Sequence, residues 1–184
     1  FEESENQNGG PSITPAGGTL TENGYLFGKG QGPSLSGAVT KDDYSIEFEF
    51  KLDTIDPWQK LIDFKDRSVN AGLYLREGQL RFRADAANVV DGAANALSDD
   101  QRHKLKITRD SESQIVRVWL DDLLQFEFKD TEELAIFSGE NQIIHFLRED
   151  TAFGVNDPEG TLFSVRINET LEPGRWTSDV PAVT

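Results

Sequence analysis

The sequence predicts an all-β fold, a sandwich of two antiparallel sheets, and three observations lead to this prediction. Hydrophobic and polar residues alternate with a period of two in several segments, short turn sequences separate these segments about every ten residues, and helical patterns are nearly absent. Parallel strands buried on both faces would instead give continuous apolar runs, so one-sided alternation indicates antiparallel sheets. The chain of 184 residues is long enough for one large β domain.

Four segments carry the alternation and define the expected core. The inward residues are Ile46, Phe48, Phe50 and Leu52 in segment 45–53, Leu105 and Ile107 in segment 103–109, Phe126 and Phe128 in segment 125–130, and Phe163, Val165 and Ile167 in segment 162–168. The chain contains 12 Phe and no Cys, so the core must hold the fold by packing without disulfides.

The segments between the strands give further local predictions. Glu77-Gly78 and Asp121-Asp122 each separate two apolar stretches and predict tight hairpin turns. Residues 131–139 could form one helical turn capped at Thr131, and residues 85–96 are expected to be a long loop.

The charge is strongly acidic, with 33 Asp and Glu against 18 Lys and Arg and a net charge of −15. Such a field repels nucleic acid and anionic membrane surfaces, so neither is expected as a partner. No run of 18 apolar residues is present, and the sequence predicts no membrane span. The acids indicate a well-solvated surface, and divalent-cation binding is the alternative interpretation.

The order of these segments resembles a known family. Residues 58–82, WQKLIDFKDRSVNAGLYLREGQLRF, with the strands that precede and follow them, are similar to the concanavalin A-like, laminin-G-like jelly-roll domains of exported bacterial, cyanobacterial and algal proteins. The resemblance covers roughly residues 18 to 169. It implies two antiparallel sheets of five to seven strands with jelly-roll connections. It also implies binding of glycans or proteins, calcium at one rim in some members, and glycoside hydrolysis in a minority.

The resemblance also suggests a division of the chain and a location. Residues 1–17 are expected to be a flexible or extended tail, residues 18–170 the jelly-roll domain, and residues 171–184 a second tail, since both ends are polar and contain Gly or Pro. The expected location is extracellular or at the cell surface, with the periplasm or an organelle lumen as the alternative.

Glycoside hydrolysis requires two carboxylates that flank a sugar-binding cleft. The nearest candidates are Glu47 and Glu49, which share one face of a predicted strand but are followed by Lys51. A solvated outer face explains these two residues better, and the chain is expected not to be an enzyme.

Calcium binding is the second candidate, because Ca²⁺ takes six to eight oxygen ligands. Two acidic clusters could converge on it: Asp63, Asp66 and Asn70, and Glu149, Asp150, Asn156 and Asp157. Ordinary turn chemistry is the alternative for both clusters. For the first cluster a third interpretation is favoured, in which alternating charges pin a loop through ion pairs and hydrogen bonds; its members are Lys60, Asp63, Lys65, Asp66 and Arg67.

Aromatic rings that stack on sugars are the third candidate. Trp58, Trp119 and Tyr74 are the predicted ligand-binding residues, with packing in the core or an interface as the alternative. The sequence therefore predicts a non-catalytic binding or adhesion module that recognises a glycan or a protein surface, with or without calcium. A structural subunit that assembles through its terminal tails is the alternative, and a glycoside hydrolase is a distant third.

Overall fold

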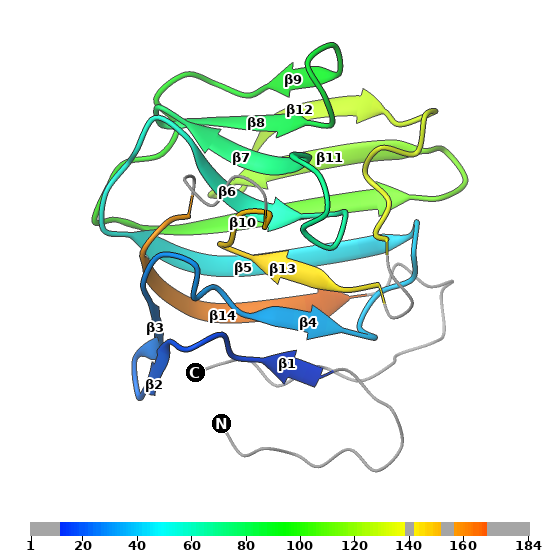
Figure 1. Ribbon diagram of the computed structural model, residues 1–184. Coiled ribbons are helices and arrows are strands. Elements are labelled where there is room, and N and C mark those ends of the chain that lie inside the picture. Colours follow the sequence, from blue (N-terminus) through cyan, green and yellow to red (C-terminus); the bar gives the residue numbers. More distant parts are fainter. Residues whose placement is uncertain (1–11, 139–141, 152–156, 169–184) are drawn as a thin grey trace.

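Two seven-stranded antiparallel sheets face each other across a hydrophobic core in the computed structural model, which describes residues 12–138, 142–151 and 157–168 (Figure 1). The first, sheet A, has the order β1 (Ser12–Thr14), β4 (Ser34–Ser36), β13 (Ile144–Phe146), β6 (Gln59–Asp63), β7 (Gly72–Arg76), β8 (Gln79–Arg83) and β9 (Val89–Asp91). The second, sheet B, has the order β12 (Leu123–Lys129), β11 (Ile115–Leu120), β10 (Arg102–Asp110), β5 (Tyr44–Leu52), β14 (Gly160–Asn168), β3 (Gly24–Phe27) and β2 (Thr19–Thr21). The predicted all-β jelly-roll sandwich is confirmed.

The core lies between the sheets and is built from the residues that alternation placed inward. Ile46, Phe48 and Phe50 on β5 are fully buried, and so are Leu105 and Ile107 on the neighbouring β10. The Phe48 ring meets the ring of Phe146 from β13 of sheet A, with 5.4 Å between ring centroids in an edge-to-face arrangement. Aromatic pairs of this kind join the two layers and add to the burial of apolar area.

One predicted core residue is wrong. β14 pairs with β5 through a register shift between Leu162 and Ser164, so Leu162 is buried and Phe163 lies outside the core. The Phe163 ring instead lies under the guanidinium of Arg102, 4.2 Å from its centroid. A β-bulge inserts one residue and reverses the alternation at that point, which a strict period of two cannot anticipate.

Both predicted hairpin turns are confirmed. Glu77 and Gly78 have φ of 50° and 79°, and Asp121 and Asp122 have φ of 50° and 66°. Positive φ at both central residues is the signature of the type I′ turn, whose twist matches that of the strands it joins.

Two other segments differ from their predictions. Residues 131–138 form turns without a helix, because the Asp130 carboxylate accepts hydrogen bonds from the amides of Leu134 (2.7 Å) and Ala135 (3.1 Å). The expected loop at residues 85–96 contains β9, which pairs with β8. Within the N-terminal segment expected to be a flexible or extended tail, Ser12–Thr14 is extended, forms β1 and pairs with β4. The predicted C-terminal tail, residues 171–184, lies outside the described residues.

Across the described segments, no helix has the length and apolar character needed to cross a membrane.

Candidate ligand-binding face

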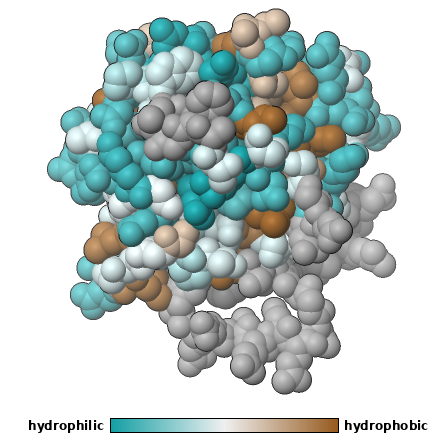
Figure 2. Space-filling view, viewed as in Figure 1, coloured by the Kyte–Doolittle hydropathy of each residue, from teal (hydrophilic) through white to brown (hydrophobic). Residues whose placement is uncertain are grey.

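The outward face of sheet A carries two of the three aromatic residues predicted to bind ligand, and most of the predicted calcium ligands lie on it or beside it. Partners across an antiparallel ladder point to the same side, and Lys60, Tyr74, Arg81 and Asp91 form one such row across β6, β7, β8 and β9. Figure 2 shows the molecule from this side, where the surface is mostly hydrophilic with separate hydrophobic residues. Two features dominate the face: a buried ion cluster around Lys60 and a group of arginines around Trp58.

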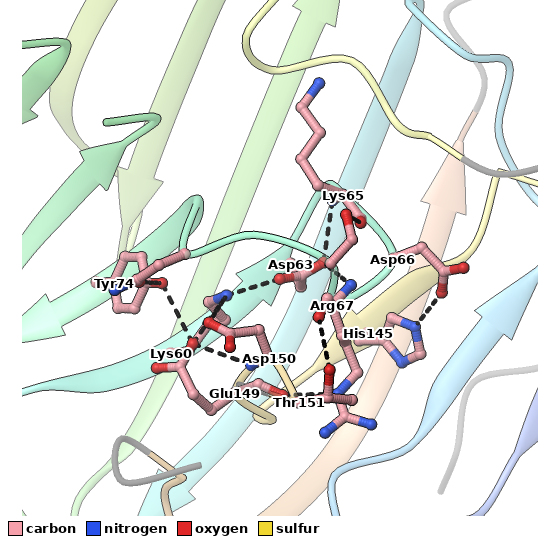
Figure 3. Close-up of polar contacts among 12 residues, drawn as sticks. Lys60, Asp63, Lys65, Asp66, Arg67, Tyr74, His145, Glu149, Asp150 and Thr151 are labelled. Atoms are coloured by element: carbon pink, nitrogen blue, oxygen red, sulfur yellow. Dashed lines mark hydrogen bonds and ion pairs between the residues drawn. The ribbon is translucent and has the colours of Figure 1, made fainter. Parts of the chain in front are cut away.

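The Lys60 cluster consists of Lys60, Asp63, Glu149 and Asp150, whose side chains are all fully buried (Figure 3). Lys60 Nζ lies 2.6 Å from Asp63 Oδ2, 2.9 Å from Glu149 Oε1 and 3.8 Å from Asp150 Oδ2. Buried charges are tolerated only when they are paired and hydrogen-bonded. One ammonium therefore holds together three carboxylates from two distant segments, the end of β6 and the chain that follows β13.

Backbone hydrogen bonds extend this network. Asp63 Oδ1 accepts from the amides of Lys65 (3.0 Å) and Arg67 (2.7 Å), which fixes the turn after β6. Arg67 Nε then donates to the carbonyl oxygen of Glu149 at 2.6 Å and ties the turn to the second acidic segment. The interpretation of this motif as a loop pinned by charges is confirmed.

Tyr74 forms the floor of the cluster. Its hydroxyl donates to Asn70 Oδ1 and lies 3.4 Å from Glu149 Oε1, and Lys60 Nζ lies 5.2 Å from the centroid of its ring. Burial first, and then the charge of Glu149, raise the pKa of Tyr74 well above its usual range, so the hydroxyl stays a donor. The ring is fully buried, so Tyr74 lies beneath the surface of this face of sheet A.

The predicted calcium ligands separate into several partnerships. Asp63, Glu149 and Asp150 converge, and the ammonium of Lys60 lies among them. Asp157 accepts from the amide of Glu149 at 2.7 Å, and Asp66 pairs with His145. Asn156 lies outside the described residues, and no group of three or more His, Asp or Glu within the described ranges is arranged to hold a metal ion.

Calcium binding stays a prediction from the sequence, and thermal melting tests it. A ligand that binds only the folded state at 100 times its Kd stabilises that state by about 2.7 kcal/mol. If calcium binds as predicted, the melting temperature in millimolar calcium should lie several degrees above the melting temperature in EDTA. Identical melting curves would contradict calcium binding.

His145 makes the stability of this face depend on pH. Its Nε2 lies 2.9 Å from Asp66 Oδ1, and its side chain is largely buried on β13. Burial lowers the pKa of His145, and the hydrogen bond that its ring donates to Asp66 opposes that effect only in part. The contribution of neutral His145 to stability is therefore fully present above the unfolded-state pKa of about 6.5 and is lost as the pH falls through the lower folded-state pKa.

We expect His145→Gln to lose less stability than the unmodified protein when the pH falls from about 7 to 5, because glutamine does not take up a proton. Urea unfolding at each pH measures the difference between the two proteins. Parallel curves, with the same loss in both, would contradict this assignment to His145.

The Trp58–arginine patch, comprising Trp58, Arg76, Arg81 and Arg83, is the second feature of the face. The guanidinium carbons lie 5.2 Å, 5.4 Å and 5.9 Å from the indole centroid for Arg76, Arg81 and Arg83, and all four residues are half-buried. The Trp58 ring also meets Tyr74 edge to face, with 5.8 Å between centroids. Trp58 was predicted to bind ligand, but the arginines were not. The arginines occupy alternate positions on both sides of the Glu77-Gly78 turn, which places them on the outward face. This alternation could have been used to predict them.

Trp119 lies on the opposite side of the molecule. It is half-buried on the outward face of sheet B, with Lys106 Nζ 5.6 Å from its ring centroid. The same face carries Glu47, which pairs with Arg166 at 3.6 Å, and Glu49, which accepts from Arg102 Nε at 2.7 Å. These two glutamates belong to a solvated, ion-paired surface, as expected. The two predicted tryptophans therefore cannot contribute to one site.

No family model matches the sequence, and no curated protein matches it. Solved structures do match. Domain 4 of AbnA, a GH43 extracellular arabinanase from Geobacillus stearothermophilus in complex with arabinotriose, is 18% identical with a TM-score of 0.60, over 86% of this chain and 82% of that chain. The CBM40 of the Ruminococcus gnavus IT-sialidase, bound to α2,3-sialyllactose, is 13% identical with a TM-score of 0.50, over 70% of this chain and 75% of that chain. A Trypanosoma rangeli sialidase in complex with the inhibitor DANA is 16% identical with a TM-score of 0.60, over 84% of this chain and 26% of that chain. At these identities the similarity shows the fold alone.

Proposed function

We propose that this chain is a non-catalytic module that binds carbohydrate through the outward face of sheet A. The observation that carries the proposal is the match to two sugar-bound units over most of their length, 82% of the arabinanase domain and 75% of the CBM40. The match to the sialidase, by contrast, covers only 26% of that enzyme. A fold alone does not determine function, so the proposal also rests on the residues of the face.

The chemistry of the carboxylates supports a binding role over hydrolysis. A glycosidase needs one carboxyl group to donate a proton and a second to act on the sugar from the cleft. Here Asp63 and Glu149 share the ammonium of Lys60 and are fully buried, so a sugar cannot reach them. Glu47 and Glu49 are ion-paired on the other sheet.

The Trp58–arginine patch gives the face the elements that sugar recognition uses. A half-buried indole offers apolar area, and guanidinium groups offer several directed donors for hydroxyl or carboxylate oxygens. We also propose that the chain functions outside the cell, at a surface or in a matrix. The strand order further suggests a relationship to laminin-G-like domains.

Isothermal titration calorimetry with a panel of neutral and acidic oligosaccharides tests this function. We expect at least one saccharide to bind and Trp58→Ala to weaken it by about tenfold or more. Trp119→Ala is the matched control on the opposite face and should leave the affinity unchanged. The absence of binding across the panel, or a loss confined to Trp119→Ala, would contradict the proposal, and release of reducing sugar would contradict its non-catalytic part.

A further inference from the structure

We propose, on the basis of the function above, that the preferred ligand is a carboxylate-bearing saccharide whose acid group is held by Arg76 and Arg83. These two residues belong to the Trp58–arginine patch and form no hydrogen bond or ion pair with any residue that the structure describes. Their guanidinium carbons lie 5.2 Å and 5.9 Å from the same indole centroid. Each of these two guanidinium groups therefore lies beside the Trp58 ring, and neither is paired with a carboxylate of the described residues.

The composition of the chain makes this arrangement informative. The net charge is −15, and acids outnumber bases by 33 to 18, so carboxylates are abundant. The arginines on the strands of sheet B are paired with carboxylates, for example Arg117 with Glu127 and Arg166 with Glu47. Hydrogen bonds from Asn88 and Ala87 lower the pKa of Asp85, the charge of Arg83 adds to this only weakly, and the Asp85 carboxylate forms no ion pair with Arg83. Unpaired positive charge in so acidic a protein creates a local field that attracts an anion.

The third arginine shows the geometry that the patch can offer. Arg81 holds the Asp91 carboxylate with two hydrogen bonds, Nε to Oδ1 at 2.5 Å and Nη2 to Oδ2 at 2.7 Å. A guanidinium has five N–H donors around its edge that match a planar carboxylate, and contact with an aromatic face leaves these donors available. Arg76 and Arg83, which contact the same indole, can therefore present to a ligand the fork that Arg81 presents to Asp91.

Trp58 positions the guanidinium groups of Arg76 and Arg83. It follows the turn into β6, and its ring is fixed from one edge by Tyr74, which the Lys60 cluster in turn holds in place. The arginines come from β7 and β8, on either side of the type I′ turn at Glu77-Gly78. Rigid strands and a fixed indole hold long side chains whose ordering would otherwise weaken binding.

Calorimetry with matched saccharide pairs tests the inference: α2,3-sialyllactose against lactose, and tetragalacturonate against its methyl ester. We expect an acidic member to bind about tenfold or more tightly than its neutral partner, and added salt to reduce the difference. Arg76→Gln and Arg83→Gln should each remove most of this preference, and Arg76→Lys should restore only part of it because lysine lacks the planar fork. Arg117→Gln on sheet B is the charge-matched control and should change nothing.

The outcomes separate this inference from the proposed function. Equal binding of neutral and acidic partners, with no effect of Arg76→Gln or Arg83→Gln, would overturn the inference while the carbohydrate-binding function stands. Tighter binding of a sulfated oligosaccharide than of either carboxylated one would overturn the carboxylate assignment. No binding of any saccharide would overturn both. Thermal melting of each variant shows whether it is folded, and an unfolded Arg83→Gln leaves Arg76→Gln to decide.

Discussion

Replacing Lys60 with methionine is expected to lower the free energy of unfolding by about 3 to 5 kcal/mol. The ammonium is fully buried 2.6 Å from Asp63 and 2.9 Å from Glu149, with Asp150 at 3.8 Å. Methionine fills similar space but removes the only cation of the Lys60 cluster, which leaves like charges buried together. Urea unfolding followed by tryptophan fluorescence measures the loss.

A surface lysine and a second substitution serve as controls for this prediction. Lys104→Met removes an ion pair to Asp122, whose side chain is 80% exposed, and should cost less than about 1 kcal/mol. The double variant Lys60→Met/Glu149→Gln should be more stable than Lys60→Met alone, because it removes one of the unpaired charges. A loss of less than about 1 kcal/mol for Lys60→Met would show that the cluster does not depend on its ammonium.

Arg109→Met is the second substitution with a large expected effect, again a loss of about 3 to 5 kcal/mol. Arg109 on β10 is 2% exposed, its Nε donates to Asp130 Oδ2 at 2.9 Å, and its Nη1 donates to the carbonyl oxygen of Asp42 at 2.5 Å. The same Asp130 carboxylate fixes the turn that follows β12. The substitution therefore leaves a buried acid unpaired and loosens a turn that packs on the core.

Arg117→Met is the control for this experiment, since it removes an exposed pair with Glu127 on the same sheet and should cost about 1 kcal/mol or less. Glycan binding gives a second readout. Arg109 lies on sheet B, away from the Trp58–arginine patch, so the folded Arg109→Met protein should keep its affinity. A variant as stable as the Arg117→Met control would contradict the role given to Arg109.

The sequence was sufficient to predict the sandwich because its evidence is local. Alternation placed Phe48 and Phe50 inward, and two-residue turn sequences set the hairpins at Glu77-Gly78 and Asp121-Asp122. Local patterns failed at Phe163, where a bulge reverses the strand faces. They failed again after Asp130, where a side chain caps a turn in place of a helix.

The site was less predictable because it depends on contacts between distant segments. Lys60 and Glu149 meet only because β13 lies beside β6 in sheet A, a neighbour relation that no spacing in the sequence reveals. Trp58 was recognised as an aromatic residue at a strand entrance, but its arginine neighbours follow from the register of β7 and β8. Charge alternation did predict that Asp63 pins the turn after β6, since that interaction is local.

Nuclear magnetic resonance of the tryptophan indole N–H groups tests the binding face most directly. The probes are α2,3-sialyllactose and tetragalacturonate, each titrated until calorimetry shows saturation, with Trp58→Phe and Trp119→Phe used to assign the signals. We expect the Trp58 signal to move with saturation, together with the Nε–H signals of Arg76 and Arg83, while the Trp119 signal stays in place. Saturated binding that moves Trp119 and leaves Trp58 unchanged would contradict it.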